Sequence, residues 1–103
     1  MISILLPSRG RPKALSESIE GLLALADRPG SIEILIASDP DDLDTRAVDL
    51  PWQASTWTAP ERYGYPRLHE YVNRLAQRAD GDWLMLWNDD ARMLTRGWDA
   101  LVG

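Results

Sequence analysis

The stretch Asp82-Trp83-Leu84-Met85-Leu86-Trp87-Asn88-Asp89-Asp90 is an apolar run that ends in an amide and two carboxylates. Five consecutive residues of this run are large and apolar, a pattern typical of a strand buried on both faces of a parallel sheet. In open α/β sheets, ligands bind outside the carboxyl ends of the strands. The run therefore predicts a buried strand whose C-terminal end carries Asp89 and Asp90 into a ligand site.

The segments before this run alternate between strand and helix patterns. Residues 2–6 form an apolar strand-like segment, and two prolines and a glycine at 7–12 break it. Apolar side chains then recur at helical spacing from Pro12 to Ala26, and residues 32–37 are rich in β-branched side chains. A strand, a helix and a strand in this order predict a right-handed crossover between parallel strands.

The remaining segments extend the same alternation. We expect a third strand at 53–58, a second helix from Pro66 to Ala79, and a further helix at 95–102. The order βαβ(α)βαβ predicts one α/β domain over residues 1–103, with a Rossmann-like, mostly parallel sheet and flanking helices.

Composition narrows the classes of function. The chain has 103 residues, of which 45% are hydrophobic and 26% charged, as in an ordinary folded domain. The net charge of −5 argues against nucleic-acid binding. No apolar stretch approaches the roughly 20 residues that span a bilayer, so no membrane span is expected. The absence of cysteine excludes disulfides and thiolate metal sites and fits a cytoplasmic location.

The segment Asn88-Asp89-Asp90 has two interpretations. On an extended strand, Asn88 and Asp90 point one way and Asp89 the other. Carboxylate oxygens suit Mg²⁺ or Mn²⁺, so one aspartate could ligate a cation while its neighbour bonds a sugar hydroxyl. Asn and Asp also form turns, and a plain turn is the alternative.

A second acidic segment, 38–44, follows the predicted strand at 32–37. Asp39 lies at the end of that strand, where it could bond a base or a ribose. The calcium-loop pattern fails because Leu43, Asp44 and Leu50 occupy positions that it reserves for an oxygen ligand, Gly and Glu. We expect Asp41 with Asp44 to cap a helix instead.

The turn Ser8-Arg9-Gly10-Arg11 precedes a helix N-terminus, a position that favours phosphate. It lacks the glycine triplet of a dinucleotide site and the Gly-Lys-Ser/Thr of a P-loop, which disfavours NAD and kinase-type ATP binding. Trp52 or Trp57 could stack on a base, but burial would account for either equally well.

Taken together, these motifs resemble the nucleotide-binding half of family 2 glycosyltransferases with the GT-A fold. The resemblance rests on Ile4 to Pro12, on Glu33 to Asp39, and on Asn73 through Asn88-Asp89-Asp90, and it runs over nearly the whole chain. Ser38 stands where the family has the first Asp of an acidic pair. Asn88 stands where it has the first Asp of an Asp-x-Asp motif.

The resemblance implies a role for each matching residue. Pro7, Ser8 and Arg9 would line the uridine or guanosine pocket, and Asp39 would bond the base. Asp89 would bond the ribose, and Asp90 would hold the Mn²⁺ or Mg²⁺ that bridges the diphosphate. Arg67 would lie near the phosphates. In family members that invert the anomeric centre, a carboxylate general base serves the acceptor, and here it would lie beyond Gly103.

The resemblance therefore implies a domain that binds a UDP- or GDP-linked sugar with a divalent cation and transfers the sugar to an acceptor. The alternative is a non-catalytic nucleotide-binding or assembly module that retains this half of the fold. On this interpretation the chain is an apparently truncated GT-A-type domain. An exposed sheet edge at Trp83, Met85 and Trp87 would then favour self-association.

Overall fold

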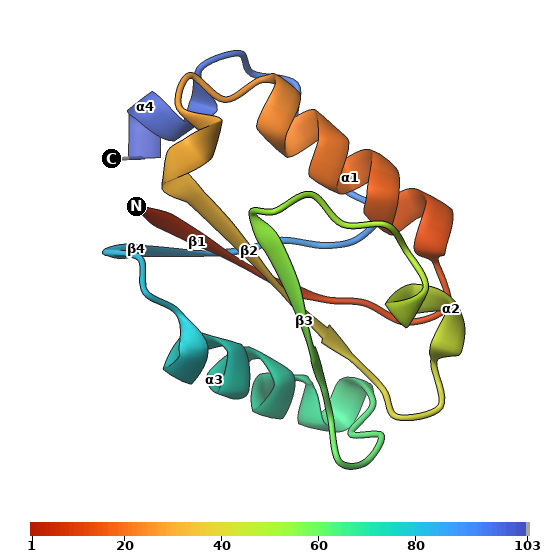
Figure 1. Cartoon of the computed structure of the whole chain (residues 1–103). Coiled ribbons are helices and arrows are strands. Elements are labelled where there is room, and N and C mark those ends of the chain that lie inside the picture. The colour runs from red at the N-terminus through yellow and green to blue at the C-terminus, as the bar shows by residue number, and fades with distance from the viewer. Residues whose placement is uncertain (103) are drawn as a thin grey trace.

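The computed structural model describes residues 1–102, which form a four-stranded parallel sheet between helices (Figure 1). The strand order is β3-β2-β1-β4, with β1 at Ile2–Pro7 flanked by β2 at Ile32–Ser38 and β4 at Trp83–Leu86. This confirms the predicted Rossmann-like α/β class. The other elements are α1 (Pro12–Ala24), η1 (Pro29–Ser31), α2 (Leu43–Arg46), β3 (Ala54–Thr58), η2 (Tyr65–Arg67), α3 (Leu68–Arg78) and α4 (Trp98–Val102).

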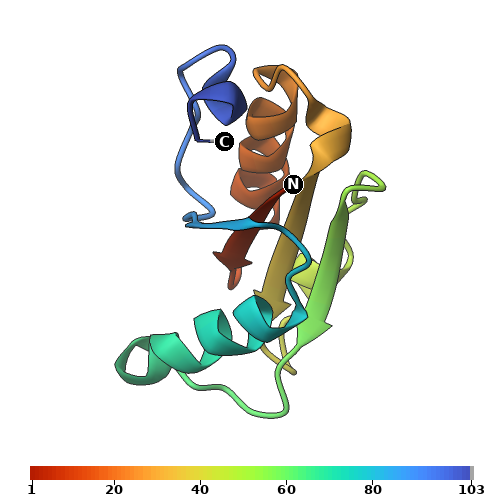
Figure 2. The same cartoon turned by 90° about the vertical axis from the view of Figure 1, so that its left-hand side faces the viewer.

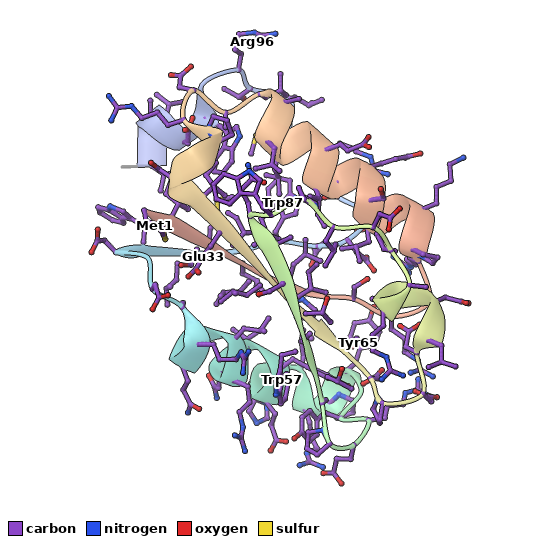
Figure 3. The ribbon with its side chains drawn as sticks, viewed as in Figure 1. Met1, Glu33, Trp57, Tyr65, Trp87 and Arg96 are labelled. Atoms are coloured by element: carbon purple, nitrogen blue, oxygen red, sulfur yellow. The ribbon has the colours of Figure 1, made fainter. Side chains whose placement is uncertain are left out.

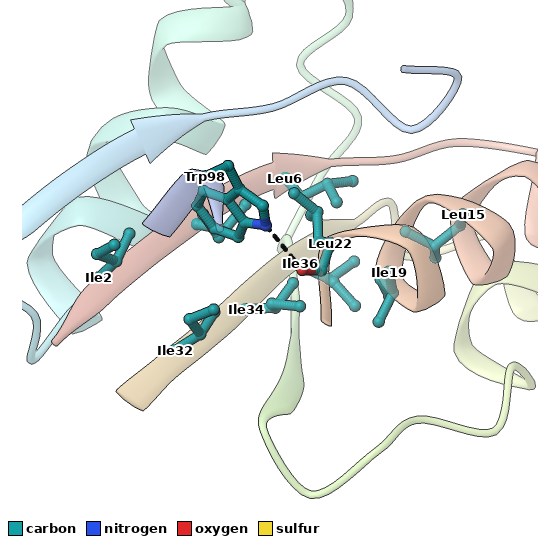
Figure 4. Close-up of a cluster of buried hydrophobic side chains, with 10 residues drawn as sticks. Ile2, Leu6, Leu15, Ile19, Leu22, Ile32, Ile34, Ile36 and Trp98 are labelled. Carbon is teal, nitrogen blue, oxygen red and sulfur yellow. Dashed lines mark hydrogen bonds between the residues drawn. The ribbon is translucent and has the colours of Figure 1, made fainter. Parts of the chain in front are cut away.

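The sheet separates two apolar clusters, since successive strand residues point to opposite faces. Ile4, Ile34 and Ile36 face α1, and Leu5 and Leu35 face α3. The α1 cluster also contains Leu15, Ile19 and Leu22 from the helix (Figure 4), and the α3 cluster contains Tyr71 and Leu75. Figure 3 shows Trp57 on the α3 side and Trp87 on the α1 side. Both central strands are therefore covered on both faces.

The fourth strand differs from the prediction. It is an edge strand of four residues that ends at Leu86, and its only strand partner within residues 1–102 is β1. Leu84 is 52% and Leu86 55% exposed, whereas Met85 packs at the margin of the α1 cluster. The prediction of a strand buried on both faces was wrong, because α3, which lies below the sheet (Figure 2), packs on β1 and β2 and leaves Leu84 and Leu86 exposed.

The C-terminal segment returns to α1. The predicted helix at 95–102 begins only at Trp98, after a turn in which Gly97 adopts φ +71° and donates its N–H to the carbonyl of Leu25. The buried indole of Trp98 donates to the carbonyl of Leu22 at 2.8 Å (Figure 4). Asp99 accepts from the backbone N–H groups of residues 27 and 28. Burial would raise the pKa of Asp99, but these bonds outweigh it and lower the pKa.

No helix within residues 1–102 is both long and apolar enough to cross a membrane.

Candidate nucleotide site

The carboxyl ends of β1, β2 and β4 meet at one edge of the sheet. Because β1 is central, the turn after it lies between the ends of its two neighbours. The connections from β1 to β2 and from β3 to β4 place α1 and α3 on opposite faces, which makes this edge a topological switch point. Ser8, Asp39 and Asp89 follow the three strands and are all buried.

Ser8 ties the turn after β1 to both neighbouring strands. Its hydroxyl donates to Asp89 Oδ2 at 2.9 Å, and its backbone N–H donates to the carbonyl of Ala37 at 3.0 Å. Pro7, the last residue of β1, is half-buried. It lies opposite Ala37 of β2 and is the last β1 residue paired with that strand. The sequence placed these residues at one crevice, and the structure brings Ser8 and Asp89 into direct contact.

Arg9 joins the same turn to the loop after β2. Its guanidinium donates to Asp39 Oδ2 at 2.8 Å and forms a two-pronged pair with Asp41 at 2.7 and 3.0 Å. The hydrogen bond from Arg9 lowers the pKa of Asp41 to about 2, and the two carboxylates raise the pKa of Arg9. Asp41 is therefore an arginine partner, not the helix cap that the sequence predicted.

The cap is Asp42. It accepts from the backbone N–H of Thr45 at 3.2 Å and from the Thr45 hydroxyl at 2.6 Å, and so begins α2. Its other contact is the backbone N–H of Gly10 at 2.9 Å, in a turn where Gly10 has φ +63°. Burial would raise the pKa of Asp42, but the bonds from Thr45 and Gly10 lower it. One carboxylate thus fixes both a helix start and the turn after β1.

Tyr71 is a site residue that the sequence reasoning missed. Its hydroxyl donates to Asp39 Oδ1 and accepts the backbone N–H groups of Tyr63 at 2.8 Å and Gly64 at 3.2 Å. Burial and the bond to Asp39 raise the pKa of Tyr71, which keeps the phenol protonated as a donor. The available signal was its position four residues before the buried Leu75, on the packed face of α3.

Arg67 lies in η2, just before α3, and two aromatic rings connect it to Asp39. Its guanidinium lies 4.7 Å from the ring centre of Tyr63, which meets Tyr71 edge to face at 5.0 Å. It also pairs with Glu61 at 3.1 Å and Glu70 at 2.6 Å. The bond to Glu70 is the main reason that its pKa is raised. Contact with phosphate stays a prediction for this residue.

The segment after β4 is a turn. The N–H of Ala91 donates to the carbonyl of Asn88 at 3.1 Å, so residues 88–90 form a turn and the expected alternating strand geometry is wrong. Ser18 of α1 holds this turn at both ends. Its hydroxyl accepts the indole N–H of Trp87 at 2.7 Å and donates to the carbonyl of Ala91 at 2.9 Å. The sequence predicts a helix at Ser18 but gives no sign of these contacts.

A guanidinium occupies the place that the resemblance assigns to a cation. Arg11 Nη1 lies 3.2 Å from Asp90 Oδ2 and 3.5 Å from Asp89 Oδ1. Within residues 1–102 no group of three or more His, Cys, Asp or Glu side chains could hold a metal ion. Ser8 and Arg11 already donate to one oxygen of Asp89 and one of Asp90, which leaves fewer free oxygens for a divalent ion. The role of Asp90 as a metal ligand stays a prediction.

Neither tryptophan considered for stacking faces an open position at this edge. Trp52 is 79% exposed but precedes β3 and lies beside Gly30, at the opposite end of the sheet. Trp57 packs at the margin of the α3 cluster. The aromatic side chains nearest to Asp39 come instead from Tyr63 and Tyr71.

Comparison with known proteins identifies the fold. No family model matches the sequence, and no curated protein matches it significantly. Two crystal structures of S. aureus TarS 1-349 match 97% of the chain. The structure in complex with UDP has a TM-score of 0.78 at 18% identity, and the other has 0.74 at 17%. This chain spans 30% of the length of either. It therefore shares the α/β fold of part of TarS.

Proposed function

We propose that this chain is the nucleotide-binding part of a family 2-like glycosyltransferase and binds a nucleoside diphosphate, UDP or GDP, with its attached sugar. One observation carries the proposal: the turn after β1 is bonded to the ends of both neighbouring strands through Ser8 with Asp89 and Arg9 with Asp39. The shared fold with TarS crystallised with UDP supports the same assignment.

The chemistry of the edge suits such a ligand. Asp39 supplies carboxylate oxygens for the N–H of a base, and Asp89 supplies them for a ribose hydroxyl. Arg9 and Arg11 lie in the turn that leads into α1, and a helix N-terminus with nearby guanidinium groups favours a diphosphate. In the transfer reaction, an acceptor hydroxyl would attack the anomeric carbon and the nucleoside diphosphate would depart.

Calorimetric titration of UDP and GDP into the wild-type chain, Asp39→Asn and Asp49→Asn tests this function. Asp49 is an exposed aspartate outside the site and serves as the matched control. We expect binding of one nucleotide, a loss of about tenfold or more in Asp39→Asn, and no change in Asp49→Asn. Equal binding by Asp39→Asn, with its circular dichroism unchanged, would refute the assigned site, and no binding of either nucleotide would refute the function.

A second candidate function has an observation of its own. At this edge, the carboxylates of Asp39, Asp41, Asp42, Asp89 and Asp90 all have hydrogen-bond donors from the chain. The carboxylates are thus held in place within the chain, as in a module that binds a nucleotide without transferring a sugar. Nucleotide binding without sugar transfer or donor hydrolysis would support that candidate, and turnover would exclude it.

A further inference from the structure

Arg11 is the charged residue of the edge to which the resemblance gives no role. It is the residue immediately before α1, and its guanidinium is about half exposed. Its hydrogen bond to Asp90 comes from Nη1, which leaves the donors on Nη2 and Nε for another acceptor. Arg11 therefore contacts the Asp89–Asp90 pair and still has donors for an anion at the start of α1.

Three of the four oxygens of the carboxylate pair already have a donor or a guanidinium beside them. Ser8 donates to Asp89 Oδ2, and Arg11 lies beside Asp89 Oδ1 and Asp90 Oδ2. A Mn²⁺ or Mg²⁺ ion would need some of the same oxygens, and two cations at one carboxylate pair repel each other. The Arg11 guanidinium therefore opposes binding of a metal ion at this pair.

The start of α1 has no acidic residue of its own to offset the helix dipole. The helix has thirteen residues, no side-chain cap and no acidic residue in its first turn. Its first N–H groups and its dipole are therefore not compensated by a carboxylate from its own first turn. Arg11, with its remaining donors, stands at the same helix end, and a guanidinium binds phosphate oxygens in pairs.

We propose that Arg11 is the resident cation of this site: it neutralises Asp89 and Asp90 and holds the diphosphate, so that nucleotide binding does not require a divalent metal. The inference rests on the proposed function and specifies how that site recognises its diphosphate. It replaces the cation that the resemblance assigns to Asp90.

The first experiment compares UDP and GDP binding in EDTA and in Mn²⁺ for wild type, Arg11→Gln and Arg11→Lys. Arg92→Gln is the matched control, because Arg92 also forms an exposed pair, with Glu17 at 2.9 Å, outside the site. We expect wild type to bind in EDTA, with an affinity that Mn²⁺ changes by less than about threefold. Arg11→Gln should lose about tenfold or more in EDTA, Arg11→Lys less, and Arg92→Gln nothing.

The second experiment needs no nucleotide. Electron paramagnetic resonance of Mn²⁺ titrated into the apo-protein measures free and bound metal directly. We expect negligible binding to wild type, and measurable binding to Arg11→Gln that disappears in Arg11→Gln/Asp90→Asn, because removing the guanidinium frees the oxygens.

The outcomes separate this inference from the proposed function. Wild-type nucleotide binding that is lost in EDTA, or an Arg11→Gln variant as tight as wild type in EDTA, would overturn the role of Arg11 while leaving nucleotide binding intact. If no variant binds either nucleotide, the function fails, and with it the diphosphate role. The resonance measurement still tests the claim that Arg11 keeps metal away from Asp89 and Asp90. Mn²⁺ bound by wild type through Asp90 would overturn that claim.

Discussion

Tyr71 is the residue whose hydroxyl connects a buried carboxylate to a loop. It donates to Asp39 and accepts two backbone N–H groups, from Tyr63 and Gly64. Tyr71→Phe leaves those groups without their acceptor, so we expect a loss of about 1–3 kcal/mol in the free energy of unfolding and weaker nucleotide binding. Tyr65→Phe, at a side chain 86% exposed (Figure 3), is the control. Urea denaturation compares them, and equal stability would contradict the argument.

Ser18 acts at the same scale, on the turn that carries Asp89 and Asp90. Ser18→Ala removes the acceptor of the Trp87 indole and the donor to the carbonyl of Ala91. We expect a cost of about 1–3 kcal/mol in unfolding and a weaker affinity for UDP, because the turn is no longer fixed to α1. Ser16→Ala on the same helix provides the comparison. An affinity for UDP identical to that of wild type would mean that the turn holds its shape without Ser18.

At the scale of elements, α2 depends on Asp42. Asp42→Ala removes the N-cap of α2, which typically costs about 0.5–2 kcal/mol in the free energy of unfolding, and also the acceptor for Gly10 N–H.

The lowered pKa values of Asp41, Asp42 and Asp99 mean that the folded state holds their protons less tightly than the unfolded state does. Their stabilisation is therefore complete above their unfolded pKa, about 4, and is lost as the pH falls through their folded values. Urea midpoints between neutral and acidic pH should fall less steeply in Asp42→Asn than in wild type.

The connection from α3 to β4 depends on a close approach that only glycine permits. A Cβ at Gly81 would lie 2.5 Å from Ser3 Oγ and 2.8 Å from the Ser3 backbone nitrogen. We expect Gly81→Ala to destabilise the fold by about 1–3 kcal/mol, since backbone must move. Gly21 in α1 meets open space, so Gly21→Ala should stabilise by about 0.5–1 kcal/mol. Thermal unfolding of the two variants should show a lower midpoint for Gly81→Ala and a higher one for Gly21→Ala than for wild type. An unchanged midpoint for Gly81→Ala would mean that the turn can shift freely.

Helices and strands with a regular pattern of apolar residues could be predicted from the sequence. The contacts between the polar side chains of the site could not. The helix at α1 and the strands β1 and β2 follow from local patterns, because both faces of these strands are buried. The exposure of β4 depends on where α3 lies, which no local pattern encodes. Ser8, Arg11, Asp39 and Asp89 could be placed at the edge because they follow strands whose ends converge, whereas the pairing of Arg11 with Asp90 and of Tyr71 with Asp39 joins residues 79 and 32 positions apart.

At the scale of the whole molecule, the open question is the β4 edge. The N–H groups of Trp83 and Trp87 point toward β1, so by the alternation of a parallel ladder those of Leu84 and Leu86 point away from it. An edge with free N–H groups and exposed Trp83, Leu84 and Leu86 is a template for another strand. We therefore still predict self-association of the chain through this edge.

Leu84→Lys tests that prediction with little effect on the sheet, because its side chain is half exposed and a charge on an edge strand opposes pairing. Leu94→Lys, at a side chain 90% exposed outside the sheet, is the matched control. Light scattering over rising concentration should give a growing mass for wild type and Leu94→Lys and a monomer mass for Leu84→Lys. A monomer mass for all three would show that the exposed edge does not pair, and the apolar surface of β4 would then need another partner to explain it.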